Sequence, residues 1–156
     1  MANVSHKNIT EANLHEPKGA STAAVNTVYV SDGAGSGAWA QAPYYYSLSQ
    51  QLADVSTASS TYFVIPTGGI IDSIRTVLHG AITVADAALT FFINGVPITS
   101  SGITVAYSGS AAGDRDSSSP SAARTVVAGD LVTATTDGGS TTTMPITIVI
   151  RVKVTA

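Results

Sequence analysis

Apolar and polar residues alternate most regularly near the end of the chain. Isoleucine or valine occupies every second position from 146 to 154, and most of the positions between them carry hydroxyl or basic side chains. Because successive side chains of a strand point to opposite faces, this pattern predicts a strand with one apolar face and one mostly polar face. Such a strand is typical of a half-buried antiparallel sheet.

Short apolar runs separated by turn residues follow one another from residue 62 onward, at intervals of roughly ten positions. The dipeptide Asn94-Gly95 stands between two of them and predicts a two-residue hairpin turn. About eight strands in all favour an all-β fold, a jelly-roll-like antiparallel β-sandwich, over a seven-stranded immunoglobulin-like sandwich. The runs before the last strand cover residues 62–65, 70–78, 88–93, 96–99, 103–107, 125–127 and 131–136.

Two segments lack this strand pattern. In residues 47–55, Leu48, Leu52 and Val55 have the spacing of one helical face, which predicts one or two helical turns. Residues 109–123 have no apolar pattern and predict an exposed loop.

The first part of the chain, residues 6–39, does not predict a self-contained fold. Apolar residues are sparse and aperiodic before Val28-Tyr29-Val30, and small residues with glycines follow. A segment of this kind buries too little surface to offset its ordering entropy. We therefore expect an extended N-terminal arm over residues 1–46 and the β-sandwich over residues 47–156.

Two features divide the expected arm. The glycines of residues 33–37 predict a flexible hinge. Tyr44, Tyr45 and Tyr46 form an aromatic neck, which covers either an end of the sandwich core or a subunit interface, where tyrosine is enriched.

Composition narrows the classes of function. The formal net charge is -3, which argues against a nucleic-acid partner because that affinity is built mainly on Lys and Arg. The chain has no cysteine, so neither a disulfide nor a thiolate metal site can form. Neither a signal-peptide core nor an apolar run of membrane-spanning length occurs, so we expect no membrane association.

The sequence offers no convincing catalytic or metal-binding set. The three histidines, His6, His15 and His79, have no neighbours that define a nucleophile or ligand set, and no G-x-S-x-G motif occurs. The glycines of residues 33–37 do not have the spacing of a phosphate-binding loop. Asp114-Arg115-Asp116 resembles the start of a calcium loop, but Thr125 stands where the bidentate acid would be required. We expect no enzyme activity, no cofactor and no metal.

The N-terminal segment also resembles a string that recurs in structural proteins of tailed bacteriophages. The residues that carry the resemblance are 14–20 (LHEPKGA), 26–30 (NTVYV) and 33–39 (GAGSGAW). The remainder is similar to the jelly-roll domain of phage head fibres and capsid decoration proteins. This resemblance implies a homo-oligomer, most often a trimer, fixed to the outer surface of the virion head.

From the resemblance we expect a capsid decoration (cement) protein whose arm binds the major capsid protein. Val28-Tyr29-Val30 would add a strand to a neighbouring sheet, and the three neck tyrosines would form the oligomer interface. The residues expected to bind the capsid are Leu14, His15, Pro17, Lys18, Val28, Tyr29, Val30 and Trp39.

A second function remains open at this stage. The chain could be a head or tail fibre module whose loop 109–123 binds a host-surface glycan, although only Tyr107 at its border supplies an aromatic ring for a sugar. A depolymerase would need clustered acids, and the aspartates are scattered along the chain.

Overall fold

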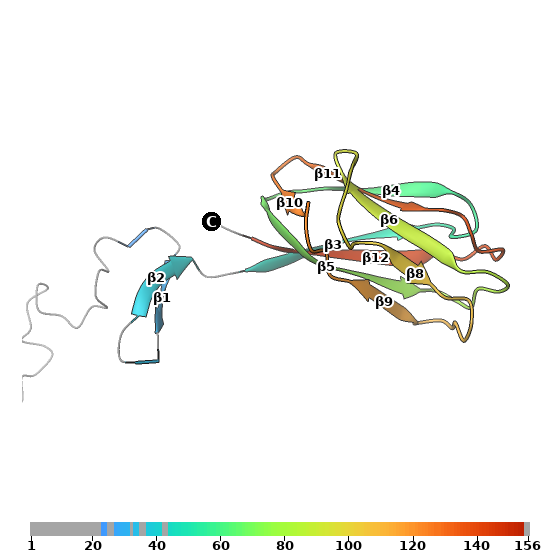
Figure 1. Ribbon diagram of the computed structural model, residues 1–156, viewed down its shortest axis with the longest axis horizontal. Coiled ribbons are helices and arrows are strands. Elements are labelled where there is room, and N and C mark those ends of the chain that lie inside the picture. Colours follow the sequence, from blue (N-terminus) through green and yellow to red (C-terminus); the bar gives the residue numbers. More distant parts are fainter. Residues whose placement is uncertain (1–22, 25–26, 32, 35–36, 42–43, 155–156) are drawn as a thin grey trace, which may run out of the picture. The chain divides into compact units, whose positions relative to one another are not determined.

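The computed structural model describes residues 23–24, 27–31, 33–34, 37–41 and 44–154. The chain divides between residues 42 and 43 into two compact units. Every regular element of the described residues is a β-strand, so the fold is all-β, as the sequence predicts (Figure 1).

The first unit contains an antiparallel hairpin of β1 (Thr27–Ser31) and β2 (Gly37–Gln41). β2 of the same chain pairs with one edge of Val28-Tyr29-Val30, so the expected pairing with a neighbouring protein stays a prediction that concerns the other edge of β1. The glycine-rich segment 33–37 connects the two strands: Gly33 has a φ of 75° and Gly37 begins β2. Of the glycines expected to form a hinge, Gly33 lies between the two strands and Gly37 lies within β2, and residue 35 is outside the described residues.

The second unit is a sandwich of two antiparallel sheets, whose layers can be followed in Figure 1. One, the β12 sheet, has the order β10-β5-β12-β3, with β9 also pairing with β5. The other, the β11 sheet, has the order β4-β11-β6-β7, with β8 also pairing with β6. The β12 sheet contains β3 (Tyr45–Leu52), β5 (Gly69–Leu78), β9 (Arg115–Ser118), β10 (Thr125–Val126) and β12 (Ile146–Lys153). The β11 sheet contains β4 (Ser59–Val64), β6 (Ala87–Ile93), β7 (Val96–Pro97), β8 (Ile103–Val105) and β11 (Leu131–Thr136).

The path of the chain through these sheets is that of a jelly roll. Strands β3, β4, β5 and β6 lie in alternate sheets, and the chain crosses again from β8 to β9, from β10 to β11 and from β11 to β12. Without the short strands β7 and β10, the orders are β3-β12-β5-β9 and β4-β11-β6-β8. Eight strands in two such sheets are the jelly-roll arrangement that the sequence predicts.

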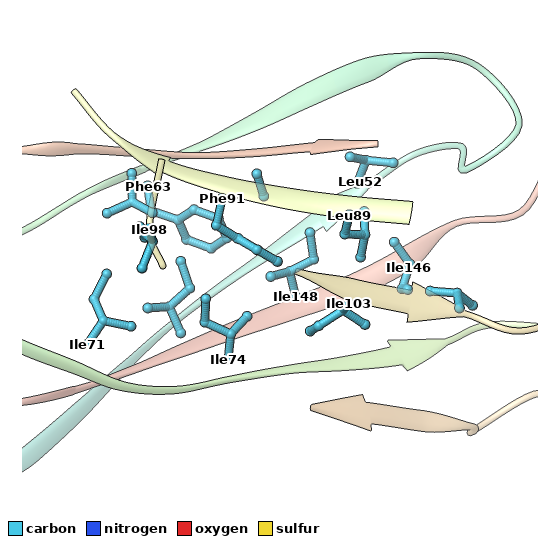
Figure 2. Close-up of a cluster of buried hydrophobic side chains, with 14 of the residues drawn as sticks. Leu52, Phe63, Ile71, Ile74, Leu89, Phe91, Ile98, Ile103, Ile146 and Ile148 are labelled. Carbon is cyan, nitrogen blue, oxygen red and sulfur yellow. The ribbon is translucent and has the colours of Figure 1, made fainter. Parts of the chain in front are cut away.

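The hydrophobic core lies between the two sheets and is built on alternate residues of their strands. Ile146, Ile148, Ile150 and Val152 of β12 are fully buried, as their alternation predicts. Figure 2 shows Phe63, Leu89 and Phe91 of the β11 sheet among isoleucines of the β12 sheet. Burying each such side chain stabilises the fold by about 1.5–3 kcal/mol, so the sandwich has a core of its own.

The turn at Asn94-Gly95 is confirmed. It joins β6 to β7, and its two residues have φ values of 48° and 83°. Asn94 also donates a hydrogen bond from Nδ2 to Asp130 and accepts one at Oδ1 from the backbone N–H of Leu131, which ties the hairpin to β11.

Two sequence predictions are wrong. Residues 47–55 contain no helix, because β3 runs to Leu52 and pairs along its whole length with β12. Residues 109–123 are not a loop throughout, because β9 lies within them and pairs with β5. In addition, β3 begins at Tyr45, inside the segment expected to belong to the arm.

Candidate interaction surfaces

The described residues of the hairpin expose apolar side chains and bury none. Tyr29 and Trp39 are paired across the two strands on one face, with ring centroids 5.5 Å apart at an interplanar angle of 67°. On the other face, Val28 and Val30 are 44% and 49% exposed. Two strands without a packed face are marginally stable in water, so the hairpin has the properties of an element that packs on a further surface. The other expected capsid-binding residues, Leu14, His15, Pro17 and Lys18, lie outside the described residues.

The three neck tyrosines have three different environments. Tyr46 packs against the sandwich core and donates a hydrogen bond to the carbonyl of Thr67. Desolvation raises the pKa of its phenol. Tyr45 lies under Arg151, whose guanidinium carbon is 4.9 Å from the ring centroid, whereas Tyr44 is 49% exposed. Tyr44 and Tyr45, each 49% exposed, therefore present more surface to a partner than the partly buried Tyr46.

The outer face of the β12 sheet carries most of the positive charge of residues 44–154. Arg75 of β5, Arg115 of β9 and Arg151 and Lys153 of β12 occupy outward or exposed positions, and together they are four of the five Lys and Arg residues in this range. We call these four residues the basic face. Arg151 is held by Asp72, with Nε 2.8 Å from Oδ2. Within the described part of the chain, Arg75, Arg115 and Lys153 have no carboxylate partner.

A shallow groove of 520 Å³ crosses this face between β9, β5 and β12. Arg75, Arg115 and Ser117 supply its polar groups, and Val77 and Val149 supply apolar surface. Thr76 also lines the groove, but its side chain is buried on the inner face of β5, where its hydroxyl has no hydrogen-bond partner among the described residues. Two guanidinium groups beside apolar surface suit a ligand with a carboxylate and a nonpolar face.

Most aspartates of the sandwich are committed to its turns. Asp54 accepts hydrogen bonds from the backbone N–H and hydroxyl of Ser56, which hold the pKa of its carboxyl below the usual range. The N–H of Val127 and the amide of Asn94 lower the pKa of Asp130 in the same way. Asp86, Asp114 and Asp137 likewise accept backbone N–H groups. These acids stabilise loops and leave the basic face largely uncompensated.

Asp116 differs from these aspartates. It lies on β9 opposite Thr76 and borders the groove. Desolvation, and to a lesser degree the charge of Asp114, raise the pKa of its carboxyl. The negative charge of Asp116 is therefore disfavoured where it stands.

The outer face of the β11 sheet has no charged residue at the outward positions of its strands. The register places Tyr62, Thr133, Phe92 and Pro97 in one row across β4, β11, β6 and β7, with Val64 beside Leu131 in the next. Tyr62 is 56% exposed and Val64 is 65% exposed. We call this surface the uncharged face; its residues are Ser60, Tyr62, Val64, Ala88, Thr90, Phe92, Pro97, Thr104, Leu131, Thr133 and Thr135.

Sequence reasoning did not single out either face. Arg151 and Lys153 were recognisable as the polar side of the last strand, and the alternation of Tyr62 and Val64 with Phe63 and Ile65 could have indicated an exposed apolar stripe. That Arg75 and Arg115 stand on adjacent strands could not be read without the pairing of β5 with β9.

The described residues contain no group of three His, Cys, Asp or Glu side chains positioned to hold a metal. His79 shares a hydrogen bond of 2.7 Å with the hydroxyl of Thr147, and Asp114 accepts the N–H of Ala111. In the same described range, no helix is long and apolar enough to cross a membrane.

The chain matches no protein-family model, and a search of curated proteins gives no match. Among solved structures, it is similar to dimeric latent PorU from Porphyromonas gingivalis, at 12% identity over 71% of this chain and 13% of that chain. The TM-score of 0.39 is too low to support any inference about function.

Proposed function

We propose that this chain is a structural protein of a phage virion that binds the outside of the capsid and stabilises the head. The observation that supports this proposal most is the exposure of Val28 and Val30 on the hairpin of β1 and β2. Among the described residues, the hairpin has no core of its own on which they could pack. The phage-like string in the sequence spans this hairpin, and the adjoining sandwich has a complete core. In this proposal the hairpin docks on the major capsid protein, and the sandwich is carried as a homo-oligomeric knob.

The hairpin docks in this proposal through side chains, because the inner edges of β1 and β2 already pair with each other. An apolar face of Val28, Val30, Ala38 and Ala40 would lie on the capsid, with the Tyr29–Trp39 pair on the opposite side. Binding that buries this face stabilises the bound state of both partners, so occupied heads gain stability by mass action.

The test compares the full chain with residues 43–156 for binding to heads that lack the protein, taken from the phage that encodes it. Cosedimentation should recover the full chain with the heads and leave the truncated chain, which keeps its own core, in the supernatant. The variant Val30→Lys should weaken binding, whereas the matched exchange Val127→Lys on an exposed sandwich position should not. Wild-type occupancy by the truncated chain would contradict the docking role.

The groove favours a second candidate function, recognition of a host glycan that carries a carboxylate. Its arginines lie on β5 and on β9, and β9 falls within the segment 109–123 that the sequence associates with this alternative. A glycan array probed with residues 43–156 should then give uronic-acid or sialic-acid hits that the double variant Arg75→Ser/Arg115→Ser loses. An array without hits, or hits that the double variant retains, would exclude this role for the groove.

A further inference from the structure

We propose that the basic face binds an extended acidic polysaccharide, whose carboxylates follow a diagonal row of cations across the β12 sheet. The row consists of Arg115, Arg75, Arg151 and Lys153. The inference rests on the second candidate function, glycan recognition by the groove. It names the class of glycan as a polymer with repeated carboxylates, in place of a glycan with a single terminal acid.

The pairing of the strands places the four cations on a diagonal. Arg115 of β9 and Arg75 of β5 lie one strand and two residues apart. Arg75 pairs with Val149 of β12, and the next two outward positions of that strand carry the other two cations, Arg151 and Lys153. With the usual strand spacing and rise, neighbouring Cα atoms of the row are roughly 8 Å apart and the whole row is roughly 20 Å long. A ligand that contacts all four cations must therefore be an extended chain.

The cations of this row are available to a ligand. Arg75 and Arg115 are exposed and line the groove. Arg151 is paired with Asp72, yet its side chain remains 42% exposed. Lys153 has no carboxylate partner among the described residues. Three of the four cations are therefore without an internal ion pair in this part of the chain, and guanidinium groups bind carboxylates in a two-bond geometry.

The groups beside the row suit sugar rings. Val77 and Val149 give the groove an apolar surface on which the nonpolar face of a ring can lie. The neighbouring strand β3 adds uncharged hydrogen-bonding side chains at outward, exposed positions, which can bind sugar hydroxyls. These side chains are Ser47, Ser49 and Gln51.

The same face is poorly suited to a nucleic acid. Single strands are held largely by aromatic rings on which successive bases stack, and the strands that carry the row, β5, β9 and β12, contain no aromatic residue. Tyr45 of the adjacent strand β3 has one ring face occupied by Arg151. Residues 44–154 carry seven aspartates against five Lys and Arg, so a polyphosphate meets a net negative unit. We therefore infer a carboxylated sugar polymer as the occupant.

The test measures how binding depends on ligand length, by isothermal titration calorimetry of the full-length protein with galacturonic-acid oligomers from the disaccharide to the octamer. We expect the affinity to rise with length until the oligomer reaches from Arg115 to Lys153, and then to level off. Lys153→Ser should weaken octamer binding about threefold, the effect of one exposed ion pair, and leave disaccharide binding in the groove unchanged. Lys153→Arg should preserve octamer binding.

The matched control is Thr90→Asp, at an exposed position of β6 in the opposite sheet. This substitution changes the net charge by the same amount as Lys153→Ser and should leave the affinity for the octamer unchanged. Circular dichroism and thermal unfolding must show Lys153→Ser to be folded, and Lys153→Gln provides a second neutral substitution at the same position.

Two results would overturn the extended site and leave glycan recognition by the groove intact: an octamer that binds no more tightly than the disaccharide, or octamer binding that both neutral variants retain in full. Equal affinity for a thymidine oligonucleotide with as many charges as the octamer would overturn the choice of a polysaccharide. Absence of binding by every oligomer would contradict this inference and the glycan candidate together. Capsid docking by the hairpin is measured separately and stands or falls alone.

Discussion

Tyr29 and Trp39 face each other across the hairpin of the first unit, edge to face, at a centroid distance of 5.5 Å. Aromatic pairs of this geometry stabilise a structure by about 0.5–1.5 kcal/mol beyond the area that they bury. Trp39 is the only tryptophan of the chain, so its fluorescence reports on the hairpin alone.

Replacing Tyr29 with alanine should loosen the hairpin and expose the indole of Trp39 to water. The expected result is an emission maximum at longer wavelength, with the thermal unfolding of the sandwich unchanged because its core contains no residue of the hairpin. Tyr107→Ala, at an exposed position of the sandwich, is the control. An unchanged emission spectrum in Tyr29→Ala would show that the ring pair does not order the hairpin.

The hydroxyl of Tyr46 should contribute to the stability of the sandwich. Tyr46→Phe removes the hydrogen bond to the carbonyl of Thr67 and leaves the ring in place, so we expect a loss of about 0.5–1.5 kcal/mol in urea unfolding. Tyr44→Phe, at an exposed ring, should have no effect. Equal unfolding midpoints for the two variants would contradict the role of this bond.

Acid should destabilise the turns that Asp54 and Asp130 organise. Hydrogen bonds to backbone N–H groups lower the pKa of both carboxyls in the folded state. Their stabilising contribution is therefore present above the ordinary aspartate pKa of about 3.9 and is lost as the pH falls through the lowered folded-state values. The melting temperature should fall over that window, and the double variant Asp54→Asn/Asp130→Asn should flatten the fall. An equally steep acid transition in the variant would be the contrary result.

Asp116 should act in the opposite direction. Desolvation raises the pKa of its carboxyl in the folded state. An acid whose pKa is raised in the folded state stabilises the fold below its unfolded-state pKa. This contribution is lost as the pH rises through the folded-state pKa. Asp116→Asn should therefore unfold at higher urea concentration than the wild type at neutral pH, and the difference should vanish in acid. A less stable variant at neutral pH would mean that the carboxylate has a partner.

The strands with period-two patterns were predictable from sequence, and β3 shows why one was not. Leu48 and Leu52 are four positions apart, a spacing that fits both a helical face and, as an even number, one face of a strand. Pairing decides between them: β3 lies beside β12, with Leu52 opposite Ile146 and Leu48 opposite Ile150. That contact joins residues about a hundred positions apart, and local spacing does not contain it.

Strands β2 and β9 were missed for a different reason. Both are held by backbone hydrogen bonding to a better-patterned partner, β1 and β5, and their own sequences, GAWAQ and RDSS, contain no β-branched residue. The basic face depends on the pairing of β9 with β5, and the uncharged face depends on the order β4-β11-β6-β7. Their residues were visible in the sequence, but their adjacency depends on sheet order.

The acidic and basic residues of the sandwich are distributed unevenly over its surface, which its net charge does not reveal. Residues 44–154 carry -2 of the chain's formal charge of -3: seven aspartates, most of them fixed in turns, stand against five Lys and Arg, four of which lie on the β12 sheet. The basic face attracts an approaching anionic surface, although the net charge of the chain repels it. This attraction acts over a distance of about 10 Å at 0.1 M salt. The orientation in which this protein approaches another surface should therefore depend on ionic strength.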